Sequence, residues 1–141
     1  MFKSTCTLAA CFALLTLTGC GSDGPQLAEV SGTVTVDGKP VPNAVLTFIP
    51  TGGTTSYGKT DAQGKYKLMF TDSKSGAMLG SHNVEIEVKR YSKDEVSEMK
   101  AAGINASSEF VPIPKKYKQP GALTAEVKKG SNTVDFPMIS Q

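Results

Sequence analysis

The sequence has few of the residues that metal-dependent and thiol-based enzymes use. It contains no tryptophan, one histidine (His82) and three cysteines, two of which, Cys6 and Cys11, lie near the amino terminus. Catalytic zinc is usually held by three protein ligands rich in histidine, so these counts argue against a zinc hydrolase. We expect His82 to be a surface or strand-end residue, and we expect neither a metal nor a cofactor.

Neither sign of charge dominates the chain. It has 15 basic and 13 acidic residues, for a formal net charge of +2. So balanced a total gives no support to nucleic-acid binding, and we expect no nucleic-acid partner. The serines and threonines are spread over strand and loop positions without a nucleophile-elbow pattern. We therefore expect the chain not to be an enzyme.

The apolar segment at the amino terminus is too short to span a membrane. One positive charge, Lys3, precedes an apolar run over residues 8–17, and two small residues then lead to Cys20. This is the three-part plan of a secretory signal. Its apolar core is shorter than the ~20 residues of a transmembrane helix. We therefore expect residues 1–19 to be a cleaved signal peptide of an exported protein.

Residues 17–20 (LTGC) resemble the lipobox of bacterial lipoproteins, whose cysteine is acylated before cleavage. The resemblance implies that Cys20 becomes the lipidated first residue of the mature chain. Each buried CH₂ contributes ~0.8 kcal/mol, so two or three acyl chains would hold the protein on a membrane. In that family an aspartate directly after the cysteine favours the inner membrane; Gly21 stands there, so we expect the outer membrane or the periplasmic face. The alternative is an ordinary signal peptide with an incidental cysteine.

The mature chain divides into a tether and one domain. Residues 20–28 begin with the lipidated Cys20 and continue with small, polar residues and a proline, which is typical of a flexible tether. Residues 29–141 have the length of a single domain. This domain has no cysteine, so its stability must come from burial without disulfides.

Residues 29–141 show the period of two that is typical of β-strands. Valines alternate with serine and threonine in residues 30–36, and Val84, Ile86 and Val88 alternate with charged side chains. Turn sequences separate such segments, which predicts about seven short strands in a two-sheet, all-β sandwich. The expected strands cover residues 30–36, 44–49, 57–60, 66–70, 84–89, 123–127 and 134–138, with a loop over residues 71–81 and an edge or crossing segment over residues 110–117.

One short helix is expected as an insertion into this β pattern. Ser92 and Glu95 have the spacing of a capping box, and Gly103 is a stop signal. These signals predict a helix over residues 93–102, with Val96 and Met99 as its apolar positions.

The turn and strand motifs resemble those of carboxypeptidase regulatory-like domains. They include D-G-x-P at residues 37–40 and T-D-x-x-G-x-Y at residues 60–66. The resemblance implies a transthyretin-like, or prealbumin-like, sandwich over residues 29–141, in which Tyr66 fills the core beside Phe48. Function does not follow from this fold.

The carboxyl-terminal part also resembles small bacterial lipoproteins that carry one such domain. The matching segments are residues 113–117, 123–127 and 130–132. Hydroxyisourate hydrolases, which share the transthyretin-like fold, require several histidines and end in Tyr-Arg-Gly-Ser. This chain ends in residues 137–141 (PMISQ), so that activity is disfavoured.

The densest group of basic residues is a candidate contact patch. It comprises Lys115, Lys116 and Lys118, with Lys128 and Lys129 following in the sequence. Such a patch can contact phospholipid headgroups or an acidic polymer. The alternative is a solvated rim of the domain without a binding role.

Other pairs of reactive residue types have simpler interpretations. Glu85 and Glu87 share one strand face, which we expect to be solvated rather than catalytic. Lys39 and Asn132 have the residue types of an internal cross-link, but Lys39 belongs to an exposed turn. Asp61 is expected to serve as a turn residue and not as a calcium ligand.

These patterns predict a membrane-anchored envelope lipoprotein. Its domain is expected to be a non-enzymatic binding or structural module that contacts an envelope protein or a polysaccharide. The alternatives are a transthyretin-like carrier of small molecules, whose pocket would require a dimer, and a hydrolase. The partner and the oligomeric state stay open at this point.

Overall fold

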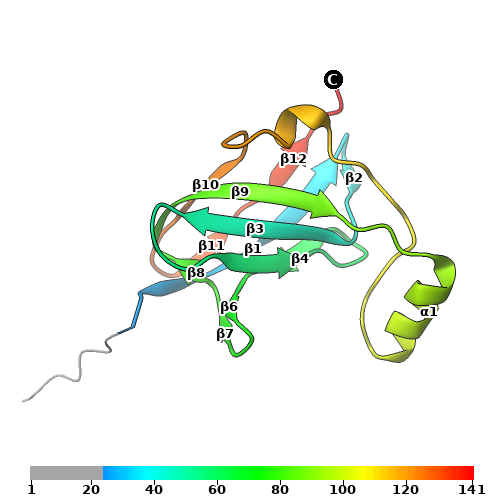
Figure 1. Cartoon of the computed structure of the whole chain (residues 1–141), viewed down its shortest axis with the longest axis horizontal. Helices are drawn as coiled ribbons and strands as arrows, with labels where there is room; N and C mark the ends of the chain where they lie inside the picture. Colours follow the sequence, from blue (N-terminus) through cyan, green and yellow to red (C-terminus); the bar gives the residue numbers. More distant parts are fainter. Residues whose placement is uncertain (1–23) are drawn as a thin grey trace, which may run out of the picture.

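The strand β1 (Leu27–Val36) forms the centre of the first of two β-sheets (Figure 1). The computed structural model describes residues 24–141, so the expected signal peptide and the lipidated Cys20 lie outside the described residues. One edge of β1 pairs antiparallel with three short strands, and the other edge pairs in parallel with two. The antiparallel partners are β8 (Ala77–Met78), β5 (Lys65–Lys67) and β2 (Lys39–Pro40), and the parallel partners are β11 (Ser131–Thr133) and β12 (Phe136–Met138).

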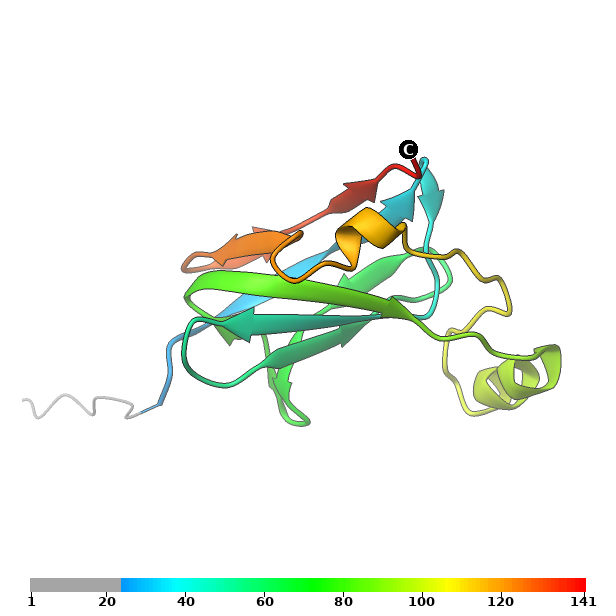
Figure 2. The ribbon, with the colours of Figure 1, turned by 45° about the horizontal axis from the view of Figure 1, so that its top comes forward.

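The second sheet is antiparallel throughout and faces the first (Figure 2). Its strands, in spatial order, are β10 (Thr124–Val127), β9 (Gly80–Val88), β3 (Ala44–Pro50), β4 (Ser56–Lys59), β6 (Met69–Thr71) and β7 (Lys74–Ser75). The two sheets and one α-helix within the described residues confirm the predicted all-β sandwich with a short inserted helix.

The alternation in the sequence matches the two faces of the strands. Val30, Val34 and Val36 are buried in β1, and the inward-facing Val84 and Ile86 are buried in β9. The glutamates between them are exposed. Burying an apolar side chain of this size contributes roughly 1.5–3 kcal/mol, so the space between the sheets is the source of stability.

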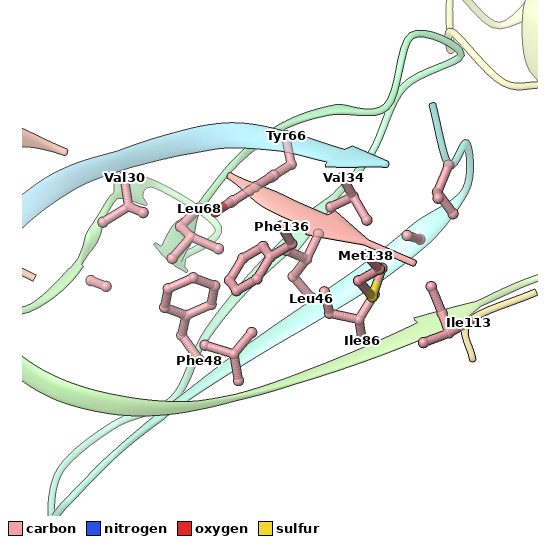
Figure 3. Close-up of a cluster of buried hydrophobic side chains, with 14 of the residues drawn as sticks. Val30, Val34, Leu46, Phe48, Tyr66, Leu68, Ile86, Ile113, Phe136 and Met138 are labelled. Carbon is pink, nitrogen blue, oxygen red and sulfur yellow. The ribbon is translucent and has the colours of Figure 1, made fainter. Parts of the chain in front are cut away.

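Three aromatic rings fill the centre of this core (Figure 3). The ring centroids of Phe48, Tyr66 and Phe136 lie 6.2 to 6.4 Å apart in tilted and edge-on arrangements, which aromatic pairs prefer. The Tyr66 hydroxyl donates a hydrogen bond to the Val134 carbonyl at 2.7 Å, so its polar end is satisfied. Burial raises the pKa of Tyr66 well above its usual range. Tyr66 therefore lies beside Phe48, as the family resemblance implied.

The expected turns and helix form as the sequence indicates. Asp37 and Gly38 both have positive φ, at 50° and 76°, which is the conformation of a tight hairpin turn, and they join β1 to β2. The helix α1 (Lys93–Ala101) begins with the predicted capping box between Ser92 and Glu95. That box lowers the pKa of Glu95, because Ser92 donates its backbone N–H to the carboxylate.

Other boundaries in the sequence prediction were wrong. The expected strand over residues 66–70 is divided between the two sheets, because Leu68 bonds to Val30 in the first sheet while Met69 pairs with Tyr57 in the second. The expected loop over residues 71–81 contains β7 and β8, and Ala77 is buried. The expected strand over residues 134–138 is likewise interrupted, and β12 begins only at Phe136.

The domain also begins earlier than expected. Leu27 and Ala28, which the sequence placed in the tether, belong to β1 and pair with Met78 and Ala77. Ala28 is buried. Residues 110–117, expected to be an edge or a crossing segment, form no strand; they are irregular chain that ends in the short 3₁₀-helix η1 (Lys115–Tyr117).

Gly32 provides a direct test of this packing. A Cβ atom at this position would meet the carbonyl oxygen of Val134 well inside van der Waals contact. We expect Gly32→Ala to lower the free energy of unfolding by at least about 2 kcal/mol, as overpacking of a core does. Urea denaturation followed by circular dichroism measures this change. Gly24→Ala is the control, because no atom lies within 4 Å of the added methyl group; equal stability of the two variants would contradict the prediction.

Candidate binding surface

The strand β9 is longer than its neighbour β10, so one half of its outer edge is not covered by a strand. β10 pairs with β9 from Gly80 to Asn83, and the Val84 N–H then bonds to the Leu123 carbonyl at 2.9 Å. Alternation along a strand directs the N–H and C=O of Ile86 to the same side as those of Val84. No hydrogen bond from the described residues reaches either group of Ile86.

A groove runs along this uncovered edge. Its volume is about 330 Å³. One wall is the β9 segment Val84–Val88, and the other consists of Tyr117, Lys118 and Gln119, at the end of η1. Figure 2 shows η1 crossing above β9. The groove therefore combines free backbone hydrogen-bonding groups with charged and aromatic side chains.

The wall formed by η1 is held by the core and by the carboxyl terminus. Ile113, just before η1, is buried near Ile86 and Met138 (Figure 3). The Tyr117 hydroxyl accepts a hydrogen bond from the Ile139 N–H at 3.3 Å. Lys116 donates to the backbone carbonyl of Gln141. These contacts fix the separation of the two walls.

A second contact fastens the same carboxyl-terminal segment to the β1–β2 turn. The Asp37 carboxylate accepts a hydrogen bond from the Ser140 N–H at 2.9 Å. Hydrogen bonding by Ser140 lowers the pKa of Asp37, and the positive charges of Lys116 and Lys39 add to this. The turn that begins the sandwich and the segment that ends it are thus tied together.

The outer face beside the groove is polar and exposed. Glu85 and Glu87 point to solvent from β9, and their cross-strand neighbours in β3 are Thr47 and Val45. The single ion pair found among residues 24–141 joins Lys67 to Glu29, so neither of these glutamates has a cationic partner there. The solvated face predicted for Glu85 and Glu87 is confirmed.

Aromatic side chains continue this outer face across β4. Tyr57 is 55% exposed, and its cross-strand neighbour Met69 is also exposed. Lys59 lies 4.8 Å from the ring centroid of Tyr91 and donates to its hydroxyl at 3.3 Å. This face presents ring surfaces and charged groups that the domain itself does not bury.

The structure separates the predicted basic residues into two groups. Lys115, Lys116 and Lys118 are exposed together on and just after η1. Lys128 and Lys129 lie at the β10–β11 turn, next to the start of β1. The candidate contact patch therefore contains the first three lysines, and the other two belong to the opposite end of the domain.

His82 was expected to be a surface or strand-end residue; it lies near the start of β9, but it is not on the surface. His82 is 2% exposed, and its ring lies 5.8 Å from that of Phe48. Its Nε2 donates to the Met78 carbonyl at 2.8 Å, while Nδ1 is buried without a hydrogen-bond partner in the described part of the chain. The buried alternation of Val84 and Ile86 continues back to His82. Position along the strand was therefore the sequence signal from which its burial could have been predicted.

The remaining candidate residues have structural roles. The Asn132 side chain bonds to the backbone of Lys128 and Glu29, and Lys39 lies near the other end of β1, so the two cannot cross-link. Asp61 accepts hydrogen bonds from the N–H groups of Gln63 and Lys65, as expected of a turn residue. Within residues 24–141, no three His, Cys, Asp or Glu side chains gather into a cluster that could hold a metal.

In the same range, none of the helices has the length and apolar character needed to cross a membrane.

Acid should release the carboxyl terminus from the β1–β2 turn. A carboxylate whose pKa is lowered by folding stabilises the folded state above its unfolded pKa, and that contribution disappears as the pH falls through the folded value. We expect the amide resonance of Ser140 to titrate with a midpoint below about 3.9, the value of an unperturbed aspartate. Asp37→Asn should abolish this titration. A midpoint at or above that value in the unmodified protein would contradict the assignment.

No family model matches the sequence, and neither a curated protein nor a solved structure matches it.

Proposed function

We propose that the chain is an exported lipoprotein, anchored through Cys20, whose β-sandwich is a non-enzymatic binding module of the cell envelope. We assign the sandwich to the transthyretin-like, carboxypeptidase regulatory-like type on the motifs at residues 37–40 and 60–66. The lipobox resemblance at residues 17–20 and the groove beside β9 support the proposal. The observation that carries it is the position of that groove relative to the start of β1.

The start of β1 lies near one end of the domain, and the groove extends from the middle of β9 towards the other end. β1 leaves the tether at Leu27, next to Met78 and the start of β9. β9 then runs the length of the sandwich to Val88, which pairs with Ala44 near the other end of β1. Figure 1 shows the amino-terminal strand entering at one end, with η1 and the carboxyl terminus towards the other. At about 3.3 Å per residue, the ten residues of β1 span roughly 30 Å.

The length of the tether limits how far the domain can move from a membrane. Seven Cα-to-Cα steps separate Cys20 from Leu27, which corresponds to at most about 25 Å in a fully extended chain. An anchored protein therefore keeps the start of β1 within about 25 Å of the lipid. When the long axis of the domain stands upright on the membrane, the groove and the candidate contact patch lie on the side away from it. This arrangement suits contact with a second component of the envelope.

The same geometry favours one ligand class for the candidate contact patch. In the upright orientation, Lys115, Lys116 and Lys118 lie about one domain length from the start of β1 and beyond the headgroups of the anchoring membrane. The Debye length at physiological ionic strength is only about 8 Å, so those headgroups exert little attraction at such a distance. An acidic polymer of the envelope is therefore the better partner for these lysines.

Removing Cys20 should release the protein from the membrane. We expect wild-type chain expressed in a bacterial host to incorporate labelled palmitate and to sediment with membranes, whereas Cys20→Ser should do neither, since it lacks the thiol that is acylated. Cys11→Ser is the matched control, because that cysteine lies in the segment to be cleaved. The anchor would be disproved by wild-type protein that takes up no label.

Charge reversal should test the candidate contact patch. We expect Lys115→Glu/Lys118→Glu to elute from an alginate column at clearly lower salt than the wild type, since basic groups facing the polymer are lost. Lys128→Glu/Lys129→Glu changes the net charge equally at the other end of the domain and should elute later than the first variant. If both variants shift alike, the patch has no specific role.

A further inference from the structure

We infer that the uncovered edge of β9 at Val84–Val88 binds one extended peptide of a protein partner by strand addition, and that this peptide carries basic residues at alternate positions. The inference rests on the proposed function as a binding module and names the partner class of its groove. Three features of the molecule support it: the β9 edge, the groove beside it and the two glutamates on its rim.

The backbone of β9 provides the hydrogen-bonding half of the site. The N–H and C=O of Ile86 point toward the groove and have no partner among residues 24–141. An added antiparallel strand would exchange two hydrogen bonds with Ile86, as recognition by β-strand addition does. The groove of about 330 Å³ lies directly on this edge, between β9 and residues 117–119. Space and unpaired backbone groups therefore coincide.

The side chains of β9 determine which peptide fits. Glu85 and Glu87 are exposed on the outer face and lack a cationic partner in the described range. A peptide residue directly opposite either glutamate lies on that same face, where opposite charges stabilise the pair. The peptide residue opposite Ile86 points inward, beside the half-buried Tyr117. A peptide that fits this edge therefore has a basic, an apolar and a basic residue at three successive positions.

Lys118 restricts where the basic residues can lie. It is the one cationic residue that lines the groove, and it belongs to the wall opposite β9. Its ammonium group repels a basic side chain that enters the groove from that wall. The basic residues of the peptide must therefore stay on the rim next to Glu85 and Glu87, which agrees with the alternation.

A second copy of this chain fits the same edge poorly. If two β9 edges paired antiparallel about Ile86, Glu85 of each copy would face Glu87 of the other. Like charges directly opposite each other destabilise a strand pair. Charged side chains on an edge strand are a common protection against self-association, and here they oppose pairing with an identical strand while they attract a basic one.

The test uses the lipidated mature protein in detergent micelles and a fluorescent peptide with the sequence Gly-Lys-Val-Lys-Val-Lys-Gly. We expect anisotropy to report binding of this peptide and hydrogen exchange to report slower exchange of the Ile86 amide. The peptide Gly-Glu-Val-Glu-Val-Glu-Gly should bind at least tenfold more weakly. A lysine peptide with both valines N-methylated should also lose at least tenfold in affinity, because the valine opposite Ile86 then cannot donate to the Ile86 carbonyl in either register.

Reversing the charges on the β9 edge should reverse the preference for the lysine peptide over the glutamate peptide. We expect Glu85→Lys/Glu87→Lys to bind the glutamate peptide better than the lysine peptide. The matched control is Asp72→Lys/Glu98→Lys, which changes the net charge equally at exposed positions in the β6–β7 turn and in α1, and it should keep the wild-type preference. Circular dichroism of both variants verifies that they fold.

Two results would overturn strand addition. Equal binding of the methylated and unmethylated lysine peptides would show that charge alone attracts them, and concentration-dependent dimerisation with protection of Ile86 would assign the edge to a second copy. The outcome for peptide binding can be distinguished from the outcome for the lipid anchor. Lipidated protein without peptide binding refutes this inference alone, whereas peptide binding by a chain that never acquires lipid refutes the anchor.

Discussion

The pairing of β1 along both of its edges is the constraint on which the rest of the structure depends. Every other strand of the first sheet pairs with β1 and with no other strand of that sheet. Gly32, near its middle, leaves room for the Val134 carbonyl and the Tyr66 ring, and the hydroxyl of Tyr66 bonds to that same carbonyl. One missing side chain thus allows the segment between β11 and β12 and an aromatic residue to meet at the core. Because β1 is continuous from the tether to the first turn, it also sets the distance between the proposed anchor and the groove.

In the second sheet, the outer edge of β9 is only partly paired, whereas β1 in the first sheet is paired along both edges. β10 covers only the first half of β9, and η1 approaches the second half without pairing to it. Such a shielded edge limits aggregation, because a strand from another molecule must enter between two walls and past two glutamates. The same groove and the same two glutamates underlie the selectivity that we propose for strand addition. Protection and the proposed recognition therefore depend on one arrangement.

The sequence predicted best where a local rule and the tertiary environment agree. The hairpin at Asp37 and Gly38 and the capping box at Ser92 and Glu95 depend on backbone conformation within a few residues, and both are present. The prediction failed at Leu68, where a continuous alternating segment changes sheets. Alternation indicates which face of a strand is buried, but it does not indicate which other strand pairs with it. His82 differs from the prediction for another reason, because its parity with Val84 directs its ring into the core beside Phe48 although histidine is polar.

Alternation, turn chemistry and capping, all local properties, allowed the sequence by itself to determine the two-sheet sandwich, the inserted helix and the exposed face of Glu85 and Glu87. Only the tertiary structure decided that β10 begins at Thr124 and so leaves half of the outer edge of β9 unpaired, that η1 lies beside β9, and that Lys115 and Lys128 lie at opposite ends of the domain. These features depend on the register between strands far apart in the chain. Register is set by the packing of Phe48, Tyr66 and Phe136 and by the length of each connection, which no single segment specifies.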